Sequence, residues 1–267
     1  MKRNIFRKVA AGIYHKVLDC KNNYRLFLKK SSKLDYINIG AGVFARKKWA
    51  VLDFSGENNF YSSSRLKFID HDINLMETKR WDIPDNKFEL AYCSCTIEHF
   101  PNKESQHLLN ETYRILKKGS IFRVVAPDIT LALLHYKNKD LEWFESCYGK
   151  FAHLPKNKEY ALEHYLLTFF STKKVEVDNI DLEQVRIDFN NMWNEDFLKK
   201  YISKYSYEHS NHHINWFDKF KLAEFLKESG FKDIQVRKRN DSDAEEFHDK
   251  DFDTTIPQMS LFMECKK

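Results

Sequence analysis

Two glycines directly after an apolar run are the first residues whose types and spacing could do chemistry. Gly40 and Gly42 follow the run 36–39, which is typical of a buried strand in a parallel sheet. Glycine lets the backbone turn tightly against a ligand at the end of such a strand. We therefore expect a nucleotide-type cofactor to bind at this loop.

Two carboxylates follow the next predicted strands. Asp53 ends the apolar run 49–53, and Asp72 lies near the end of the run 66–73. A carboxylate after the second strand of a nucleotide-binding fold can accept two hydrogen bonds from a ribose diol. Asp53 is therefore the predicted ribose ligand.

Histidines are the predicted catalytic residues. His99 follows a fourth predicted strand at 88–95, and His213 precedes a late amphipathic helix at 219–229. Group transfer to a hydroxyl needs a base that takes the proton as the oxygen attacks. An imidazole, with an ordinary pKa of about 6.5, can do this at neutral pH. Two alternatives stay open: a structural hydrogen bond for His99 and an exposed polar loop for His213.

Further elements must position these residues. A helix is predicted at 104–117, closed by Gly119. A fifth strand is predicted at 121–128, where a proline stops it. Near the end of the chain, two more strands are predicted on either side of the polar, acidic stretch 240–253. We expect that stretch to be a solvated connection.

In this order and spacing, the elements resemble the core of class I methyltransferases (Methyltransferase-11-like) that use S-adenosylmethionine (SAM). The matching residues are Ile39-Gly40-Ala41-Gly42, Asp53, Asp72-Ile73 and the segments 83–91, 97–100 and 111–119. Glu89, Lys118 and Ser120 depart mildly from the family pattern. The resemblance implies an α/β fold with a Rossmann-like, doubly wound sheet of seven strands in the order 3-2-1-4-5-7-6, the last strand antiparallel.

The resemblance also implies SAM as cofactor and activity as a SAM-dependent methyltransferase. The residues implied to bind SAM are Ile39, Gly40, Ala41, Gly42, Asp53, Phe54, Asp72, Ile73 and Cys93. Some relatives hold a metal through Glu-x-x-Glu-His. Cys95 stands in the place of the first glutamate here, so no metal is expected.

Two other functions are weaker alternatives. Residues 40–45 fit the dinucleotide fingerprint Gly-x-Gly-x-x-Ala, as in an NAD-binding oxidoreductase. That fingerprint requires a helix after the glycines and an acid about 20 residues on, and Asp53 comes too early. A non-catalytic binding module with a SAM fold is the other alternative, although the retained glycines and acids argue against it.

The chain divides into three predicted parts. A helical segment at 1–30 precedes a SAM-binding core at 31–130 and 213–267, which is interrupted by a helical insertion at 131–212. The insertion is rich in aromatic residues and should form a lid that builds the acceptor pocket. The first segment has an apolar stripe and basic residues, typical either of a helix packed on the core or of weak contact with a membrane surface.

Composition agrees with an enzyme of the cytoplasm. A chain of 267 residues can bury a sizeable core, and no apolar stretch approaches the roughly 18 residues of a membrane span. Five cysteines without a CxxC pair indicate a reducing compartment. A net charge of +5 on a chain that is 31% charged does not indicate a nucleic-acid partner.

The acceptor is the least determined part of the prediction. Members with this Glu-His and Glu-x-x-Arg core resemble proteins of bacterial surface-polysaccharide (capsule or lipopolysaccharide) assembly. The resemblance therefore implies a hydroxyl or similar acceptor, either a small molecule or a group linked to a saccharide. Amine, carboxylate and phosphate-type acceptors stay open, and the oligomeric state is not predicted.

Overall fold

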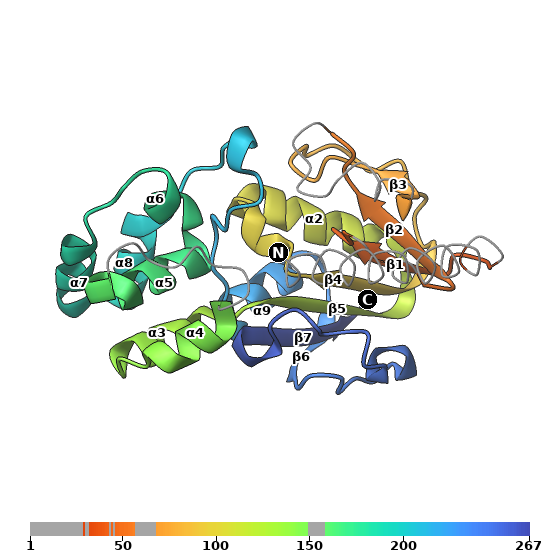
Figure 1. Ribbon diagram of the computed structural model, residues 1–267. Helices are drawn as coiled ribbons and strands as arrows, with labels where there is room; N and C mark the ends of the chain where they lie inside the picture. Colours follow the sequence, from red (N-terminus) through yellow and green to blue (C-terminus); the bar gives the residue numbers. More distant parts are fainter. Residues whose placement is uncertain (1–28, 30–31, 43, 45, 57–67, 149–157) are drawn as a thin grey trace, which may run out of the picture.

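Short apolar runs form the centre of one seven-stranded sheet (Figure 1). In the computed structural model, β1 (Tyr36–Ile39), β2 (Trp49–Asp53) and β4 (Phe88–Ser94) are largely buried, as expected for strands covered on both faces. The structure describes residues 29, 32–42, 44, 46–56, 68–148 and 158–267. The helix predicted at 1–30 lies, except for Lys29, outside the described residues.

The strand order is β3-β2-β1-β4-β5-β7-β6, which confirms the predicted fold. β1 to β5 are parallel, and β7 runs antiparallel to both its neighbours. The remaining strands are β3 (His71–Asp72), β5 (Leu116–Pro127), β6 (Lys232–Arg237) and β7 (Ser260–Lys266). In this topology the carboxyl ends of β1, β2, β3, β4 and β5 share one edge of the sheet, so their loops can build a common site.

Two helices cover one face of the sheet. α2 (Asn102–Ile115) and α9 (Lys219–Glu228) bury leucines against the strands in one hydrophobic cluster. α9 begins where Asp218 accepts hydrogen bonds from the N–H groups of Phe220 (2.9 Å) and Lys221 (2.7 Å). It ends before Gly230, whose φ of +100° suits a left-handed C-terminal residue.

The predicted end of α2 was wrong. The helix ends at Ile115, and the fully buried Leu116 already begins β5. The pairing of β4 with β5 shifts between Phe88 and Leu90, and Gly119 lies in this irregular stretch with φ +81°. Gly119 therefore permits a bulge in a strand rather than closing a helix. The strand begins before Gly119 because Leu116 is buried in the sheet.

The acidic stretch 240–253 is also not the solvated connection that its composition indicated. It contains the short 3₁₀ helix η5 (Glu245–His248) and packs Phe247 and Phe252, both fully buried, against Trp49 and Tyr92 on the second face of the sheet. At its end, Asp253 forms an ion pair with Arg123 of β5.

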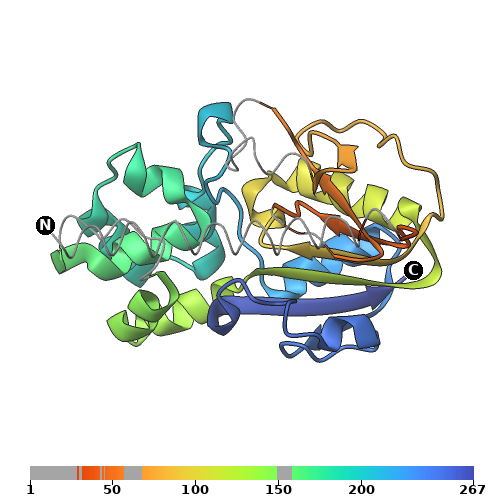
Figure 2. The ribbon, with the colours of Figure 1, turned by 45° about the vertical axis from the view of Figure 1, so that its right-hand side comes forward.

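In the described parts of the chain, six α-helices follow β5 and precede α9, and both ribbon views show them beyond the end of the sheet (Figures 1 and 2). Their interior is a separate aromatic cluster that includes Tyr165, Phe169 and Phe197. The helices are α3 (Ile129–Lys137), α4 (Leu141–Tyr148), α5 (Ala161–Phe170), α6 (Thr172–Glu176), α7 (Leu182–Asn191) and α8 (Asn194–Tyr201). Among the described residues, no helix combines the length and the apolar character needed to cross a membrane.

The Arg123–Asp253 pair is predicted to be a major stabilising contact. Both side chains are 0% exposed, Arg123 Nη2 lies 2.6 Å from Asp253 Oδ2, and Asp253 also accepts the N–H of Asn240 at 2.9 Å. Asp253→Ala leaves the buried guanidinium with only the more distant Glu264 carboxylate, at 3.6 Å, so we expect a loss of about 3–5 kcal/mol in the free energy of unfolding, measured by urea denaturation. Asp243→Ala, which removes a carboxylate 38% exposed, is the control and should cost far less. Equal effects of the two changes would contradict this prediction.

Candidate functional site

The loop after β1 is held by Asp53 at the end of β2. Gly40 and Gly42 have φ values of +65° and +54°, in the left-handed region that favours glycine. The N–H of Gly42 donates to Asp53 Oδ2 at 2.7 Å, and that of Phe54 donates to Oδ1 at 2.8 Å. Asp53 therefore fixes the glycine loop from the neighbouring strand.

Gly40 is required for a reason that the sequence did not reveal. A Cβ at this position would lie 2.2 Å from Cγ2 of Thr96, just beyond β4. Thr96 Oγ1 also donates to the Gly40 carbonyl at 3.3 Å. The sequence pattern attributed the glycine to close approach of a cofactor, whereas a protein side chain fills the space. This contact packs the loop onto the segment that carries Glu98 and His99.

Two carboxylates lie side by side at the predicted cofactor site. Asp53 and Asp72 are register partners on β2 and β3, and Asp72 also accepts the N–H of Ser55 at 2.9 Å. Burial raises the pKa of Asp53, and the charge of Asp72 adds to this, while the N–H groups of Phe54 and Gly42 oppose it. A carboxylate has about four acceptor positions, so Asp53 can still accept bonds from a ribose diol. The donor and acceptor set fits the sugar of SAM.

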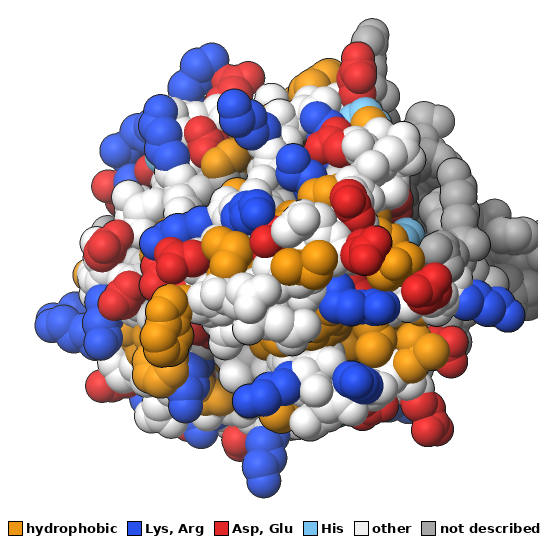
Figure 3. Space-filling view, turned by 90° about the vertical axis from the view of Figure 1, so that its left-hand side faces the viewer, with side chains coloured by type: hydrophobic (Ala, Val, Ile, Leu, Met, Phe, Trp, Pro, Cys, Tyr) orange, Lys and Arg blue, Asp and Glu red, His pale blue; other side chains and the backbone are white. Residues whose placement is uncertain are grey.

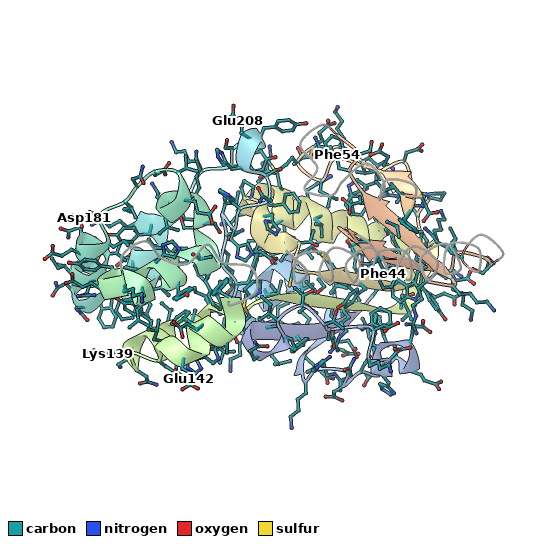
Figure 4. All side chains as sticks on the ribbon, in the orientation of Figure 1. Phe44, Phe54, Lys139, Glu142, Asp181 and Glu208 are labelled. Atoms are coloured by element: carbon teal, nitrogen blue, oxygen red, sulfur yellow. The ribbon has the colours of Figure 1, made fainter. Side chains whose placement is uncertain are left out.

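The other predicted cofactor residues take different places. The side chains of Ile39 and Cys93 are fully buried in the core and pair in register on β1 and β4, so they support the site from below. The N–H of Ala41 points to the Leu52 carbonyl (3.4 Å), and that of Ile73 donates to the Asp53 carbonyl (3.0 Å). Phe54 lies beside β2 and β3, well apart from Phe44 (Figure 4).

The dinucleotide alternative is not supported by the loop. Phe44 packs against Trp49 and Phe252, with ring centroids 5.7 and 5.8 Å apart. The described residues between Gly42 and β2 form loop and turn rather than the helix that the NAD fingerprint opens.

A second group of side chains lies beyond the end of β4. Glu98 and His99 come from the 3₁₀ helix η2 (Ile97–His99), and His213 comes from the segment before α9. The carbonyl of Glu98 joins the two segments, because it accepts the N–H groups of Ile214 (3.0 Å) and Asn215 (3.1 Å). The rings of His99 and His213 lie 5.0 Å apart, and His213 Nε2 lies 3.8 Å from Glu98 Oε1. The structure thus brings the two predicted catalytic histidines together.

Hydrogen bonds fix the tautomer of both rings. His99 Nδ1 lies 3.1 Å from the His212 carbonyl, and His213 Nδ1 lies 2.9 Å from the Phe169 carbonyl. A carbonyl only accepts, so each Nδ1 must carry the hydrogen, and each neutral ring keeps its lone pair at Nε2. Burial lowers the pKa of His99, and burial with the neighbouring His99 lowers the pKa of His213 to about 3. Both rings are therefore neutral at pH 7.

Glu98 and Tyr148 are site residues that the sequence did not single out. Glu98 is 1% exposed, neither carboxylate oxygen has a hydrogen-bond partner among the described residues, and burial raises its pKa to about 8. The hydroxyl of Tyr148, at the end of α4, is likewise buried without a described partner. Burial, with the nearby Cys147, Glu98 and Cys95, raises the pKa of Tyr148 well above its usual value. Tyr148 of the insertion therefore lies near Glu98. No motif in the sequence predicts this proximity.

Comparison with known proteins agrees with this architecture. Residues 44–124 match the family model of the methyltransferase domain. Together with the sheet order and the glycine loop held by Asp53, this match supports activity as a SAM-dependent methyltransferase. No curated protein matches it significantly.

Solved structures with a similar arrangement are distant. A SAM-dependent methyltransferase from Thermotoga maritima is 14% identical, with 99% of each chain covered and a TM-score of 0.42. An S-adenosylmethionine-dependent methyltransferase from Mesorhizobium loti is 12% identical, with 92% of this chain and 96% of that one covered and a TM-score of 0.42. Likenesses at this level carry no argument about the acceptor.

Asp53 is predicted to contribute strongly to SAM affinity. Asp53→Ala removes the predicted acceptor for the ribose diol and also the anchor of the Gly42 N–H. We expect SAM affinity to fall tenfold or more, since about 1.4 kcal/mol corresponds to a factor of ten. Isothermal titration with SAM and with S-adenosylhomocysteine measures this. Asp35→Ala, at the opposite end of β1, is the matched control and should bind as the wild type does. Unchanged affinity in Asp53→Ala would rule out the ribose assignment.

Proposed function

We propose that the protein transfers the methyl group of SAM to a hydroxyl group of a sugar or glycan precursor. The observation that carries this proposal is the group of Glu98, His99 and His213 beyond β4, beside the glycine loop. SAM, when bound, supplies a methyl group activated by a sulfonium charge. Methylation of a hydroxyl releases one proton, so the protein must align the oxygen and assist loss of that proton.

The chemical properties of Glu98, His99 and His213 favour a neutral acceptor that carries a transferable proton. Both imidazoles present lone pairs, and the Glu98 carboxyl is buried without an ion pair to any described lysine or arginine. A hydroxyl can donate to an imidazole lone pair, which supports an alcohol acceptor.

The helical insertion is the proposed acceptor-binding part. Its α5 supplies the Phe169 carbonyl that orients His213, and its α4 supplies the buried Tyr148 hydroxyl. On its outer face, acidic and basic side chains are interspersed with apolar ones (Figure 3), an arrangement that supports a small or saccharide-linked acceptor over a nucleic acid. Placement in the cytoplasm and in surface-polysaccharide assembly is part of the proposal and rests on cysteine usage and sequence resemblance.

The acceptor class can be tested directly. Purified protein is incubated with SAM carrying a labelled methyl group and with panels of nucleotide sugars, lipid-linked glycans, small phenols, amines and carboxylic acids. We expect label on an oxygen of a sugar, identified by mass spectrometry and NMR. Transfer only to an amine or a carboxylate would contradict the hydroxyl assignment while leaving the methyltransferase assignment intact.

His213 is predicted to act on the acceptor and not on SAM. The proposed cofactor site is the Asp53 loop, so His213→Gln should lower kcat by about 10²–10⁴ and change SAM affinity little. The same holds for His99→Gln. His107→Gln removes an imidazole on α2 that bonds the Lys79 carbonyl, and serves as the control with unchanged kcat. If both His99→Gln and His213→Gln keep more than about a tenth of the wild-type rate, the histidines have no catalytic role.

A further inference from the structure

We propose that Glu98, His99 and His213 form a binding site for one divalent transition-metal ion. Each offers one ligand atom, and these atoms lie within 4.8 Å of one another. This distance is what two ligands about 2.0–2.2 Å from a common ion can span after a small inward movement. The proposal replaces the sequence expectation of no metal, because that expectation considered only residues close to Glu98 in the chain.

The two imidazoles are already oriented as metal ligands. A ligating histidine commonly donates its second ring N–H to a carbonyl or carboxylate, which fixes the tautomer and the ring direction. His99 does this through the His212 carbonyl and His213 through the Phe169 carbonyl. The remaining nitrogen of each ring is therefore the one that can bind a cation, before any ion arrives.

The carboxyl of Glu98 provides the second, independent observation. It is 1% exposed, and both of its oxygens lack a hydrogen-bond partner among the described residues. Buried acidic side chains are usually paired with another group or coordinate a metal. His213 Nε2 lies 3.8 Å from Glu98 Oε1. This distance is too long for a hydrogen bond, and it leaves room for an ion between the two side chains.

The ligand set indicates which ions fit. Two imidazoles and one carboxylate suit Zn²⁺, Co²⁺, Fe²⁺ or Mn²⁺, whereas Mg²⁺ and Ca²⁺ prefer all-oxygen sites. Three protein ligands also leave a coordination position open, as in catalytic sites. Access is available because the His213 side chain is 19% exposed. This part of the inference rests on the proposed function: with an ion bound, the two imidazoles would serve as ligands instead of bases, and the ion would supply the Lewis acidity that favours loss of the proton from an acceptor hydroxyl.

Metal binding can be measured without the methyl acceptor. Full-length, tag-free protein is dialysed against EDTA, then titrated with Zn²⁺ by calorimetry and with Co²⁺ by visible absorption. We expect one equivalent to bind to the wild type and a rise in Tm on adding Zn²⁺. Glu98→Gln, His99→Gln and His213→Gln should each weaken binding at least tenfold. The controls Glu104→Gln and His107→Gln change one carboxylate and one imidazole on α2 and should bind as the wild type does.

The outcomes separate this proposal from the proposed function. Absence of stoichiometric binding to the wild type, or equal affinities in ligand and control variants, would overturn the metal site. Circular dichroism checks that each variant is folded, and the wild-type titration decides by itself if a variant is not. SAM titrated into the same preparations gives the independent reading: a wild type that binds SAM but no metal remains a methyltransferase, and one that binds metal but no SAM overturns the methyltransferase activity alone.

Discussion

The main-chain carbonyl of Glu98 makes the contact on which the group of Glu98, His99 and His213 depends. It accepts two N–H groups from Ile214 and Asn215, and so ties the end of β4 to the segment that leads into α9. The same short stretch packs Thr96 against Gly40. One turn of 3₁₀ helix therefore sets both the glycine loop on the cofactor side and the two histidines on the acceptor side, which places them at a common edge of the sheet.

The burial of ionisable groups at this edge has an energetic cost that other parts of the fold must offset. Glu98 is buried with no described ion-pair partner closer than 3.8 Å, and burial lowers the pKa values of His99 and His213. Perturbed titratable groups in one place are more frequent at functional sites than elsewhere. The apolar cluster between the sheet and the helices α2 and α9, together with the aromatic cluster of the insertion, provides the stability that offsets this cost.

On the face of the sheet that packs against Phe247 and Phe252, a buried charge is paired instead. There the buried charge of Arg123 is compensated by Asp253, by the carbonyls of Lys238 and Asp241 at 2.8 Å each, and by Glu264 at 3.6 Å. Arg123 thus shows that this fold can pair a buried charged group where the group has a structural role. The carboxyl of Glu98 has no such partner among the described residues.

The sequence by itself determined most of the strands and the glycine loop with Asp53, because apolar period and turn residues act over short distances along the chain. The strand order came from the resemblance to the methyltransferase family, since local patterns do not specify which strands pair. The sequence misplaced the end of α2 and the burial of the stretch 240–253, where Leu116, Phe247 and Phe252 follow long-range packing instead of local composition. It named His99 and His213 separately. Only the tertiary structure decided that they meet beside Glu98, since η2 and the segment before α9 are far apart in the chain and become neighbours through the Glu98 carbonyl.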